Sequence, residues 1–516
     1  MSATLWHRFA AQATAKGGNV AICHGDRTAS FADLLGATCG WACVLDAAPG
    51  DRVVIAGANS IDLAAAVPAI WAKGAIPVFV NADAPDSHLR HAIAQTGAVT
   101  LLTDRARDAG FSAAVHQIGV HQIGAHQIGA HQIAAQPAAG MPVAPGQSGA
   151  APGSIVYTSG SSGAPKGVVQ RAETLASGVD RIGAMLGYRA TERILCPIPF
   201  AFDYGWGQLL SVLLGGCSLI LPETRGGAGI CDALNRHRPT VFAGVPAVFA
   251  DLLSGLAPIG ETDRSSVRLI TNTGSRLPDA VRQGLVALFP DAELSLNYGL
   301  TETYRSASLP VAMAASHPAS VGFAVTGAVL LVLRTDGTEA GVGEEGEVVH
   351  GGAGVFHGYW ADPDRTAQVL RPDPLWQGEG DAPQVVFTGD LGHKDAAGRL
   401  YLHGRRDRQM KSMGVRVAPD EVEALLADSG LLREVAVVSR PHDTVGDLIV
   451  AVVALPEGAD AAHSLKLLKR HARDKMSPFM QPRDHIVLPA LPRNPNGKVD
   501  YPALKRLATG QEGQDG

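Results

Sequence analysis

Apolar runs alternate with helical repeats along most of the chain. In residues 51–81 an apolar run (GDRVVIAG) is followed by a helical pattern (SIDLAAAVPAIWAKG) and a second apolar run (AIPVFVNAD). Strand, helix and strand within about thirty residues form a βαβ unit, which implies a parallel sheet. Similar alternation recurs at residues 216–253 and 267–297. The pattern therefore predicts an α/β fold in which helices cover parallel sheets.

The pattern changes in the second half of the chain. Residues 346–360 (GEVVHGGAGVFHGYW) are typical of strands joined by tight turns. Beyond Gly404 we expect a charged stretch, a helix at 419–428, strands at 434–439 and 448–454, a helix at 463–474 and a strand near 485–488. These elements suffice for a separate α+β domain. The predicted units are a large domain over 1–404, a small domain over 405–506 and a disordered tail over 507–516.

Composition narrows the classes of function. A net charge of -6 makes the chain a poor candidate for binding nucleic acid or an anionic membrane through bulk charge. The six cysteines include no pair at C-x2-C zinc spacing, and no apolar run has the length of a membrane span. The first residues, MSATLWHRFAAQ, lack the apolar core of a secretory signal. We therefore expect a reduced, cytoplasmic protein with no membrane span and no nucleic-acid partner.

A five-residue repeat occupies residues 115–135 and reads VHQIG, VHQIG, AHQIG, AHQIA. Its histidines are His116, His121, His126 and His131. Residues five apart do not share one face of a helix, and on a strand they alternate between faces. A metal site needs convergent ligands, so the pattern favours a repeat in a surface loop over a metal site.

The first chemical motif is SIVYTSGSSGAPKG at residues 154–167. A short apolar strand opens into a loop of Ser, Thr and Gly that Lys166 closes. Glycines let backbone N–H groups approach an anion, hydroxyls add donors, and the lysine adds a positive charge. The order Gly160, Gly163, Lys166 differs from the GxxxxGK[ST] loop of P-loop NTPases, which excludes that class. Taken alone, the motif is a phosphate loop or a flexible linker.

The second motif is LNYGLTETYRS at residues 296–306, which follows an apolar strand. Tyr298, Thr301 and Glu302 offer a ring, a hydroxyl and a carboxylate within five residues. Such a set can stack on a base, bond a phosphate and hold Mg²⁺ through oxygen. The alternative is a capped turn with an exposed glutamate.

Two further motifs lie in the second half of the chain. In VFTGDLG the carboxylate of Asp390 could accept hydrogen bonds from the vicinal hydroxyls of a ribose. A charged stretch at the expected domain boundary then contains Arg405, Asp407, Lys411, Gly414 and Arg416. In ALPRNPNGKVD, at 490–500, an Asn-Gly turn presents Lys498, although a lone turn lysine is usually just exposed to solvent.

Together, in this order, the motifs resemble those of the ANL superfamily of adenylate-forming enzymes. YTSGSSGAPKG, NYGLTET, TGD, GRRDRQMKSMGVRV and NPNGK all match, and the likeness runs from about residue 5 to 505. The resemblance implies a large N-terminal domain of βαβ-rich sheets with a β-barrel-like part, and a small mobile C-terminal domain. It also implies ATP and Mg²⁺: a carboxylate attacks the α-phosphate, and a thiol of CoA or of a carrier protein's phosphopantetheine then displaces AMP.

The resemblance implies a role for each matching residue. The β- and γ-phosphates would contact the loop formed by Thr158, Ser159, Gly160, Ser161, Ser162, Gly163 and Lys166. Ser162 stands where the family commonly has Thr, and the hydroxyl is kept. The adenine slot would comprise Gly274, Ser275, Arg276, Asn297, Tyr298 and the adjacent Gly299. The remaining roles are the α-phosphate for Thr301, Mg²⁺ for Glu302, the ribose hydroxyls for Asp390, and the ribose and α-phosphate for Arg405 and Arg416.

Lys498 would bridge the substrate carboxylate and the α-phosphate, a task suited to a compact ammonium. Because Lys498 lies on the small domain, that domain would have to close for adenylation and swing away for thiol attack. Asp407 matches the family's hinge position, and Gly414 would line the tunnel for the pantetheine thiol.

The acid pocket is indicated by IPFAFDYGWGQLL at residues 198–210, in which Phe202 would gate the carboxylate. Asp203 falls where amino-acid-activating members place an aspartate against the α-ammonium. A buried carboxylate needs a partner, and a substrate cation would provide one. The alternative is that Asp203 caps the helix that starts near Tyr204.

A narrower resemblance is to the acyl-CoA ligases associated with exosortase systems and the stand-alone L-prolyl-carrier-protein ligases. It favours a free-standing enzyme that loads an amino acid onto a separate carrier protein, with L-proline as one candidate. A CoA ligase for a fatty or aryl acid is the second hypothesis. A non-catalytic nucleotide sensor is disfavoured, because Lys498, Glu302 and Asp390 are all present.

Overall fold

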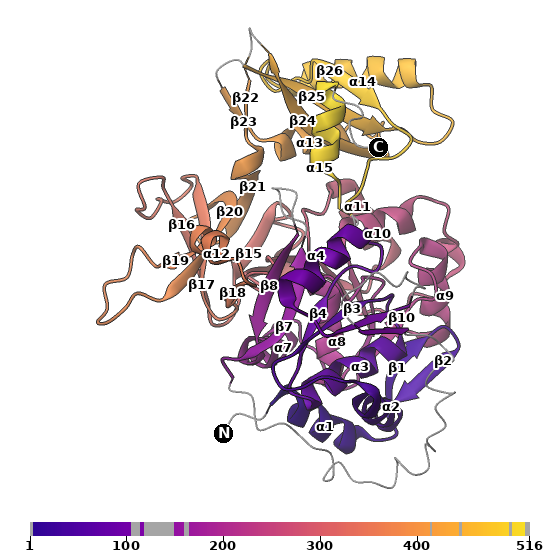
Figure 1. The fold of residues 1–516 in the computed structure, drawn as a ribbon. Coiled ribbons are helices and arrows are strands. Elements are labelled where there is room, and N and C mark those ends of the chain that lie inside the picture. Colours follow the sequence, from indigo (N-terminus) through magenta and orange to yellow (C-terminus); the bar gives the residue numbers. More distant parts are fainter. Residues whose placement is uncertain are drawn as a thin grey trace.

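The computed structural model describes residues 4–104, 114–117, 149–158, 165–412, 415–442, 446–494 and 498–510. The chain folds into a large body built on two sheets and a small body built on a third. In Figure 1 the small body, coloured orange to yellow, lies above the large one and is joined to it near β21. The arrangement confirms the predicted α/β class.

A seven-stranded sheet carries the predicted βαβ unit of residues 51–81. β3 and β4 pair in parallel, and α3 (Ile61–Ala72) connects them, as the alternating pattern predicts. All twelve residues of α3 are buried, so this helix lies between layers and not at the surface. The strand order is β18 (Gly358–Tyr359), β8 (Lys166–Arg171), β7 (Pro152–Thr158), β4 (Ile76–Phe79), β3 (Arg52–Ala56), β5 (Thr100–Thr103) and β6 (Ala114–Gln117).

The second sheet has fourteen strands and continues from a parallel part into an antiparallel part. The parallel part contains both other predicted alternations: β10, α9 (Gly227–His237) and β11, and β12, α11 (Asp279–Leu288) and β13. β12 pairs directly with β13, whereas β9 is inserted between β10 and β11. The strands of this part are β13 (Glu293–Tyr298), β12 (Leu269–Asn272), β11 (Val241–Gly244), β9 (Arg193–Leu195), β10 (Ser218–Leu221), β1 (Val20–His24) and β2 (Arg27–Ser30).

The antiparallel part contains the β-rich segment predicted at residues 346–360. Its strands are β16 (Ala328–Leu333), β17 (Gly346–Gly352), β20 (Gln384–Lys394), β21 (Leu400–Arg405), β15 (Ser320–Ala324) and β14 (Ala307–Leu309), with β19 (Leu370–Pro372) on β20. β14 pairs with β13, so the two parts share one hydrogen-bonded sheet. The carboxyl end of β13 and the turn in β20 therefore lie close together.

Five helices fill the space between the two large sheets, because their apolar residues join side chains of both sheets in one core. They are α1 (Leu5–Lys16), α2 (Phe31–Val44), α3, α7 (Ala172–Met185) and α8 (Asp203–Leu213). Trp206 of α8 packs against Phe79 and Trp71, with ring centroids 4.6 and 5.9 Å apart. This packing stabilises the first turn of α8, where the predicted acid-binding residues lie. Helices α4 (Asp86–Thr96), α10 (Pro246–Leu253) and α12 (Pro363–Val369) complete the large body.

The small body matches the elements predicted beyond Gly404. β22 (Met410–Ser412), β23 (Val415–Val417), β24 (Glu434–His442), β25 (Gly446–Ala454) and β26 (Asp484–Val487) form a five-stranded sheet. Helices α13 (Pro419–Ala427) and α14 (Ala461–Lys475) pack on it through Leu426 and Leu468. No helix in the described part of the chain is long and apolar enough to cross a membrane.

The predicted disordered tail at 507–516 is wrong at its start. Helix α15 (Tyr501–Thr509) continues through it, and Gly510 ends the helix in the left-handed region at φ 70°. Leu504 and Ala508 are buried against the small sheet, and the Asp500 side chain caps the first turn through Ala503. Burial of one apolar stripe orders a segment whose composition alone is unremarkable. Residues 511–516, and all of the His repeat beyond residue 117, lie outside the described residues.

Candidate active site

The phosphate-loop motif joins two neighbouring antiparallel strands. Thr158 ends β7 and lies opposite Lys166, which begins β8. The Thr158 hydroxyl is buried and has no hydrogen-bond partner among the residues that the structure describes, so it is available to a ligand. The predicted phosphate contacts Ser159, Gly160, Ser161, Ser162 and Gly163 lie outside the described residues.

Lys166 contacts Glu302 of the second motif, which lies 136 residues further along the chain. The Lys166 ammonium lies 2.6 Å from Glu302 Oε1 and 2.7 Å from the Tyr359 hydroxyl, which itself donates to Glu302 Oε1 at 2.7 Å. Burial opposes the charge on Glu302, but the Lys166 ammonium and the two hydrogen bonds outweigh it and leave its pKa below the usual value. Glu302 is therefore an ionised carboxylate whose oxygens can coordinate a metal ion. The alternative interpretation, a capped turn with an exposed glutamate, is wrong because Glu302 is buried.

Tyr359 was not a candidate in the sequence. It belongs to β18, which pairs with β8 and so brings the phenol beside Lys166. Its motif, GYW, carries no chemical signal of its own, and only the pairing of distant strands reveals the contact.

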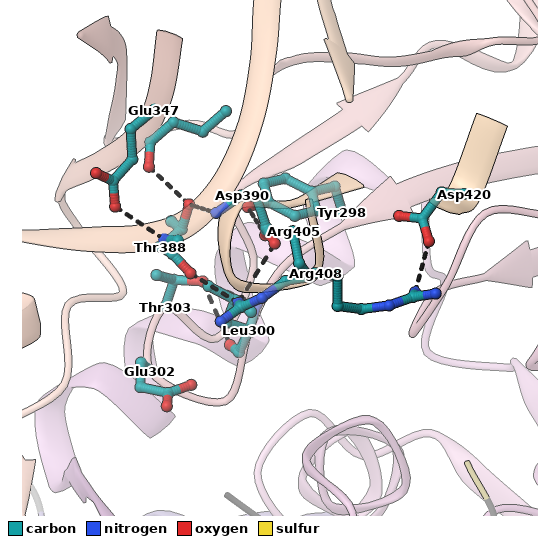
Figure 2. Close-up of polar contacts among 12 residues, drawn as sticks. Tyr298, Leu300, Glu302, Thr303, Glu347, Thr388, Asp390, Arg405, Arg408 and Asp420 are labelled. Atoms are coloured by element: carbon teal, nitrogen blue, oxygen red, sulfur yellow. Dashed lines mark hydrogen bonds and ion pairs between the residues drawn. The ribbon is translucent and has the colours of Figure 1, made fainter. Parts of the chain in front are cut away.

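The predicted ribose site forms where β13, β20 and β21 meet, as Figure 2 shows. Asp390 is 8% exposed and accepts a hydrogen bond from the Tyr298 hydroxyl at 2.5 Å. Arg405 Nη1 donates to Thr388 O at 2.8 Å and lies 3.3 Å from Asp390 Oδ1. Gly389 has φ 73°, and a Cβ there would lie 3.0 Å from Arg405 Nη2, so the turn requires glycine. Tyr298, Asp390 and Arg405 thus form one cluster.

The predicted adenine residues divide into two groups. Gly274, Ser275 and Arg276 are exposed, and Arg276 lies 3.9 Å from Asp279. Asn297 is buried, and its Nδ2 donates to Thr271 Oγ1, Asn272 O and Ser295 inside the sheet. Its amide group therefore connects β12 to β13. Asn272, which the sequence did not single out, has a buried Oδ1 without a partner and is the freer polar group here.

Asp203 is the first residue of α8, and no side chain caps this helix. The capping interpretation of Asp203 is therefore wrong. Its Oδ1 instead accepts a hydrogen bond from Gln170 Nε2 at 2.5 Å. Gln170 Oε1 accepts from Ser154 Oγ at 2.9 Å and from Trp206 Nε1 at 3.2 Å, which turns the amide N–H groups toward Asp203. Phe202, the residue before the helix, is half-buried and packs against the central core.

The environment of Asp203 disfavours its charge. Burial raises its pKa to about 7, and the hydrogen bond from Gln170 and the charge of Arg305 oppose this rise only partly. Gln170 Nε2 also lies 3.4 Å from Thr301 O, so the acid-pocket motif and the second motif share one amide group. A buried carboxylate without a bound cation partner is the arrangement that an ammonium ligand would complete.

Lys498 reaches this site from the small body. Two hydrogen bonds fix its backbone. Lys498 N donates to Asn494 Oδ1 at 3.1 Å, and Asn494 N donates to Lys498 O at 2.8 Å. The residue as a whole is exposed, but desolvation of its ammonium lowers the pKa of Lys498, whereas the charges of Glu302, Asp390 and Asp203 act in the opposite direction. Lys498 is thus within electrostatic reach of the second motif, the ribose cluster and the acid pocket together.

The residues around the predicted hinge are anchored to different bodies. Arg406 Nη1 lies 2.6 Å from Glu347 Oε2 of the large body. Arg408 Nη1 lies 2.5 Å from Asp420 Oδ1 (Figure 2). Its Nη2 lies 2.8 Å from Glu423 Oε1, and both carboxylates are on α13. Asp407 lies between these two anchors. The side chains of Asp407 and Arg416, and residue Gly414 as a whole, are not among the described parts.

Arg408→Ala should destabilise the small body. Glu423 would keep its buried place beside Asp420 without its cation, at a cost of about 3 kcal/mol. Burial already raises the pKa of Glu423 to about 7, with Arg408 acting to lower it. Since a protonated Glu423 tolerates the loss of Arg408 better, the loss of stability should be smaller at pH 6 than at pH 8. Thermal unfolding at both pH values measures this difference.

Arg406→Ala is the matched control for that variant. The Arg406 side chain is 60% exposed, so its ion pair with Glu347 should contribute less than about 1 kcal/mol. Equal destabilisation by the two substitutions would contradict the assignment of Arg408 as the anchor of the small body.

The donor set fits ATP with Mg²⁺. Mg²⁺ is usually held by one or two carboxylates together with phosphate oxygens, and Glu302 is an ionised carboxylate at the phosphate loop. The unpartnered hydroxyl of Thr158 and the unpartnered Oδ1 of Asn272 are buried polar atoms that a nucleotide could satisfy.

Known proteins share this architecture. The solved o-succinylbenzoate CoA synthetase of Bacillus subtilis, in complex with its acyl-adenylate intermediate, superposes with a TM-score of 0.82 at 22% identity, covering 98% of each chain. ATP-bound MatB from Rhodopseudomonas palustris superposes with a TM-score of 0.83 at 23% identity, covering 99% of this chain and 100% of MatB. At these identities the likeness concerns the fold.

Sequence relatives include ligases of two kinds. The chain is 30% identical over 357 residues to the delta-poly-L-ornithine synthetase of Acinetobacter baumannii, across 69% of this chain and 26% of that protein. It is 31% identical over 363 residues to the indoleacetate–CoA ligase of Aromatoleum aromaticum, across 68% of this chain and 66% of that protein. Each match spans less than two thirds of the relative's own length.

The family assignment rests on matches that cover most of the chain. Residues 9–360 match the AMP-binding enzyme family, and residues 421–498 match the AMP-binding enzyme C-terminal domain. With the fold of acyl-adenylate-forming synthetases also present, the chain belongs to the AMP-binding enzymes of the ANL superfamily, the family of ATP-dependent, AMP-forming acid–thiol ligases.

Proposed function

We propose that this protein activates an α-amino acid with ATP and Mg²⁺ and transfers it to the phosphopantetheine thiol of a separate carrier protein. The observation that carries the proposal is Asp203: it is half-buried, does not cap its helix, and is oriented by Gln170 beside the charge of Lys498. A carboxylate in this position pairs with a substrate ammonium at little further desolvation cost.

Each residue cluster has a part in this reaction. Asp203 holds the ammonium, and Lys498 holds the reacting carboxylate close to the α-phosphate, where it offsets the charge of two approaching anions. Asp390 binds the ribose, Tyr298 lies beside it in the adenine slot, and Lys166 and Thr158 bind the outer phosphates. Glu302 would hold Mg²⁺, which would offset the charge of the phosphates.

Lys166 changes partner when the nucleotide binds. The Lys166–Glu302 pair described above keeps both charges satisfied before binding, since each would otherwise be buried alone. Phosphate oxygens would then take the place of Glu302 on Lys166, which would leave the Glu302 carboxylate free to hold Mg²⁺.

The carrier-protein acceptor and the narrow subgroup belong to the same proposal. The likeness to the stand-alone L-prolyl-carrier-protein ligases makes L-proline the first amino acid to test. CoA as acceptor of a non-amino acid is the second candidate, and the similarity to an indoleacetate–CoA ligase favours it.

ATP–pyrophosphate exchange tests the proposal. The panel comprises the twenty amino acids, short and long fatty acids, and aryl acids. Exchange that depends on one amino acid supports the ammonium site at Asp203. Exchange with non-amino acids only would assign the protein to the CoA ligases and contradict the proposal.

A pH dependence should follow from the pKa of Asp203 near 7. Only the ionised carboxylate pairs with an ammonium, so lowering the pH from 8 to 6 should raise KM for the amino acid about tenfold. The deaminated analogue of the same acid, if it is activated at all, should show no such change. KM from exchange assays at three pH values measures the difference, and an identical pH profile for both acids would contradict it.

A further inference from the structure

Arg305 is a buried cation that the roles described so far leave unused. It follows Tyr304 in the loop between β13 and β14, and it is 6% exposed. Its Nη1 is buried without a hydrogen-bond partner, and the described part of the chain gives it no ion pair. Burying a guanidinium with an unpartnered N–H group is unfavourable, so its retention points to a partner that arrives from outside the chain.

The guanidinium lies against the start of α8. Its carbon is 5.6 Å from the centroid of the Tyr204 ring, within the range of a cation–π contact. The Tyr204 hydroxyl donates to Thr271 O at 2.8 Å, which fixes the ring. Since Tyr204 directly follows Asp203, the cation lies near this carboxylate and its charge acts to lower the carboxyl pKa, although the two form no ion pair in the described part of the chain.

The loop that carries Arg305 is held rigidly. Tyr304 has φ 58°, a left-handed conformation that a non-glycine residue adopts only when its surroundings enforce it. Its ring packs on α7, where a Cβ on Gly178 would lie 2.6 Å from Tyr304 Cε1. A Cβ on Gly299 would lie 3.0 Å from the Cα of Arg305. Both close contacts fix where the guanidinium can be, as a specific binding group requires.

The other charged groups of the pocket already have partners in the proposed reaction. Lys498 binds the carboxylate that is activated, and Asp203 binds the ammonium. Arg305, beside Tyr204, is therefore the cation left for the rest of the substrate, and a guanidinium binds oxygen acceptors, above all carboxylates.

We propose that Arg305 is a specificity-determining residue that binds a second oxygen acceptor, a carboxylate or a carboxamide, on the side chain of the substrate acid. The inference rests on the proposed function for the reaction and narrows its substrate. It disfavours amino acids with plain hydrocarbon side chains, L-proline included.

The test is ATP–pyrophosphate exchange with acids in which the α-amino group and the second oxygen acceptor are varied separately. One set is L-glutamate, L-norvaline, glutarate and pentanoate; a shorter set is L-aspartate, L-2-aminobutyrate, succinate and butanoate. The wild type is compared with Arg305→Gln and Arg305→Lys, and with Arg473→Gln on the exposed side of α14 as control. Thermal midpoints show whether each variant is folded.

We expect the wild type to favour acids with the second acceptor by about 100-fold in kcat/KM over their partners without it. Arg305→Gln should remove most of this preference through KM, Arg305→Lys should keep part of it, and Arg473→Gln should change nothing. Equal losses for all four acids of a set, or a wild-type preference for the acids without the acceptor, would overturn the proposal. Failure of the proposed function would be distinguishable, because kcat/KM would then not depend on the α-amino group in either set of acids.

Discussion

Replacing Lys498 with alanine should lower the rate of adenylate formation by about a thousandfold or more. The charges of Glu302, Asp390 and Asp203 all act on this ammonium, so this cation of the small body is within electrostatic reach of both the acid pocket and the nucleotide site. Its removal would leave two anions to approach each other without a bridging positive charge. Initial rates of pyrophosphate exchange measure the loss.

The second half-reaction should be largely spared in the same variant. Thiol transfer from a chemically prepared adenylate does not need Lys498 in place, since in the proposed mechanism the small body swings away before the thiol attacks. Lys505→Ala, an exposed lysine on α15, is the matched control and should keep both activities. Equal loss of both half-reactions in Lys498→Ala would contradict the two-conformation assignment.

Replacing Asp203 with asparagine should lower kcat/KM for the amino acid by about 100-fold. Asparagine keeps the shape and can still accept the hydrogen bond from Gln170, which the structure shows at 2.5 Å. Only the negative charge that pairs with the ammonium is lost, so folding should be unaffected. Desolvation raises the pKa of Asp203, so its charge is unfavourable when no ammonium is bound. The kcat/KM for a deaminated acid should therefore be unchanged or higher in the asparagine variant.

Steady-state kinetics with an amino acid and its deaminated analogue measure this prediction. Asp291→Asn, at an exposed position before β13, is the control for an amide substitution at an unrelated aspartate. An equal effect of Asp203→Asn on both acids would assign Asp203 a structural role. Its position at the first turn of α8 would then matter for the helix and not for the substrate.

Much of the fold could be predicted because its signals are local. The βαβ unit at 51–81 and the helices and strands of the small body were visible as periodic apolar positions, since burial on one face imposes period 3.6 or 2 on the sequence. The tail was predicted wrongly at 507–509, where composition suggested disorder. The ordering of α15 depends on the small sheet that receives Leu504 and Ala508.

The candidate site was predictable only where its residues form motifs. Glu302, Asp390 and Lys498 lie in short segments with a resemblance to draw on, and the structure brings their charges together. Their roles stay predictions. Gln170, Tyr359 and Arg305 had no such signal: a glutamine in a strand, a tyrosine in a short strand and an arginine beside an aromatic residue are common in any protein.

The sequence by itself determined the α/β class, the order of the elements, the adenylate-forming family and the positions of the four motifs. Only the tertiary structure decided that Asp203 faces Gln170 and does not cap its helix, and that Lys166 pairs with Glu302. The physical reason is distance along the chain. Lys166 and Tyr359 are 193 positions apart, and such contacts depend on which strands become neighbours in a sheet, whereas local periodicity reports only that each strand exists.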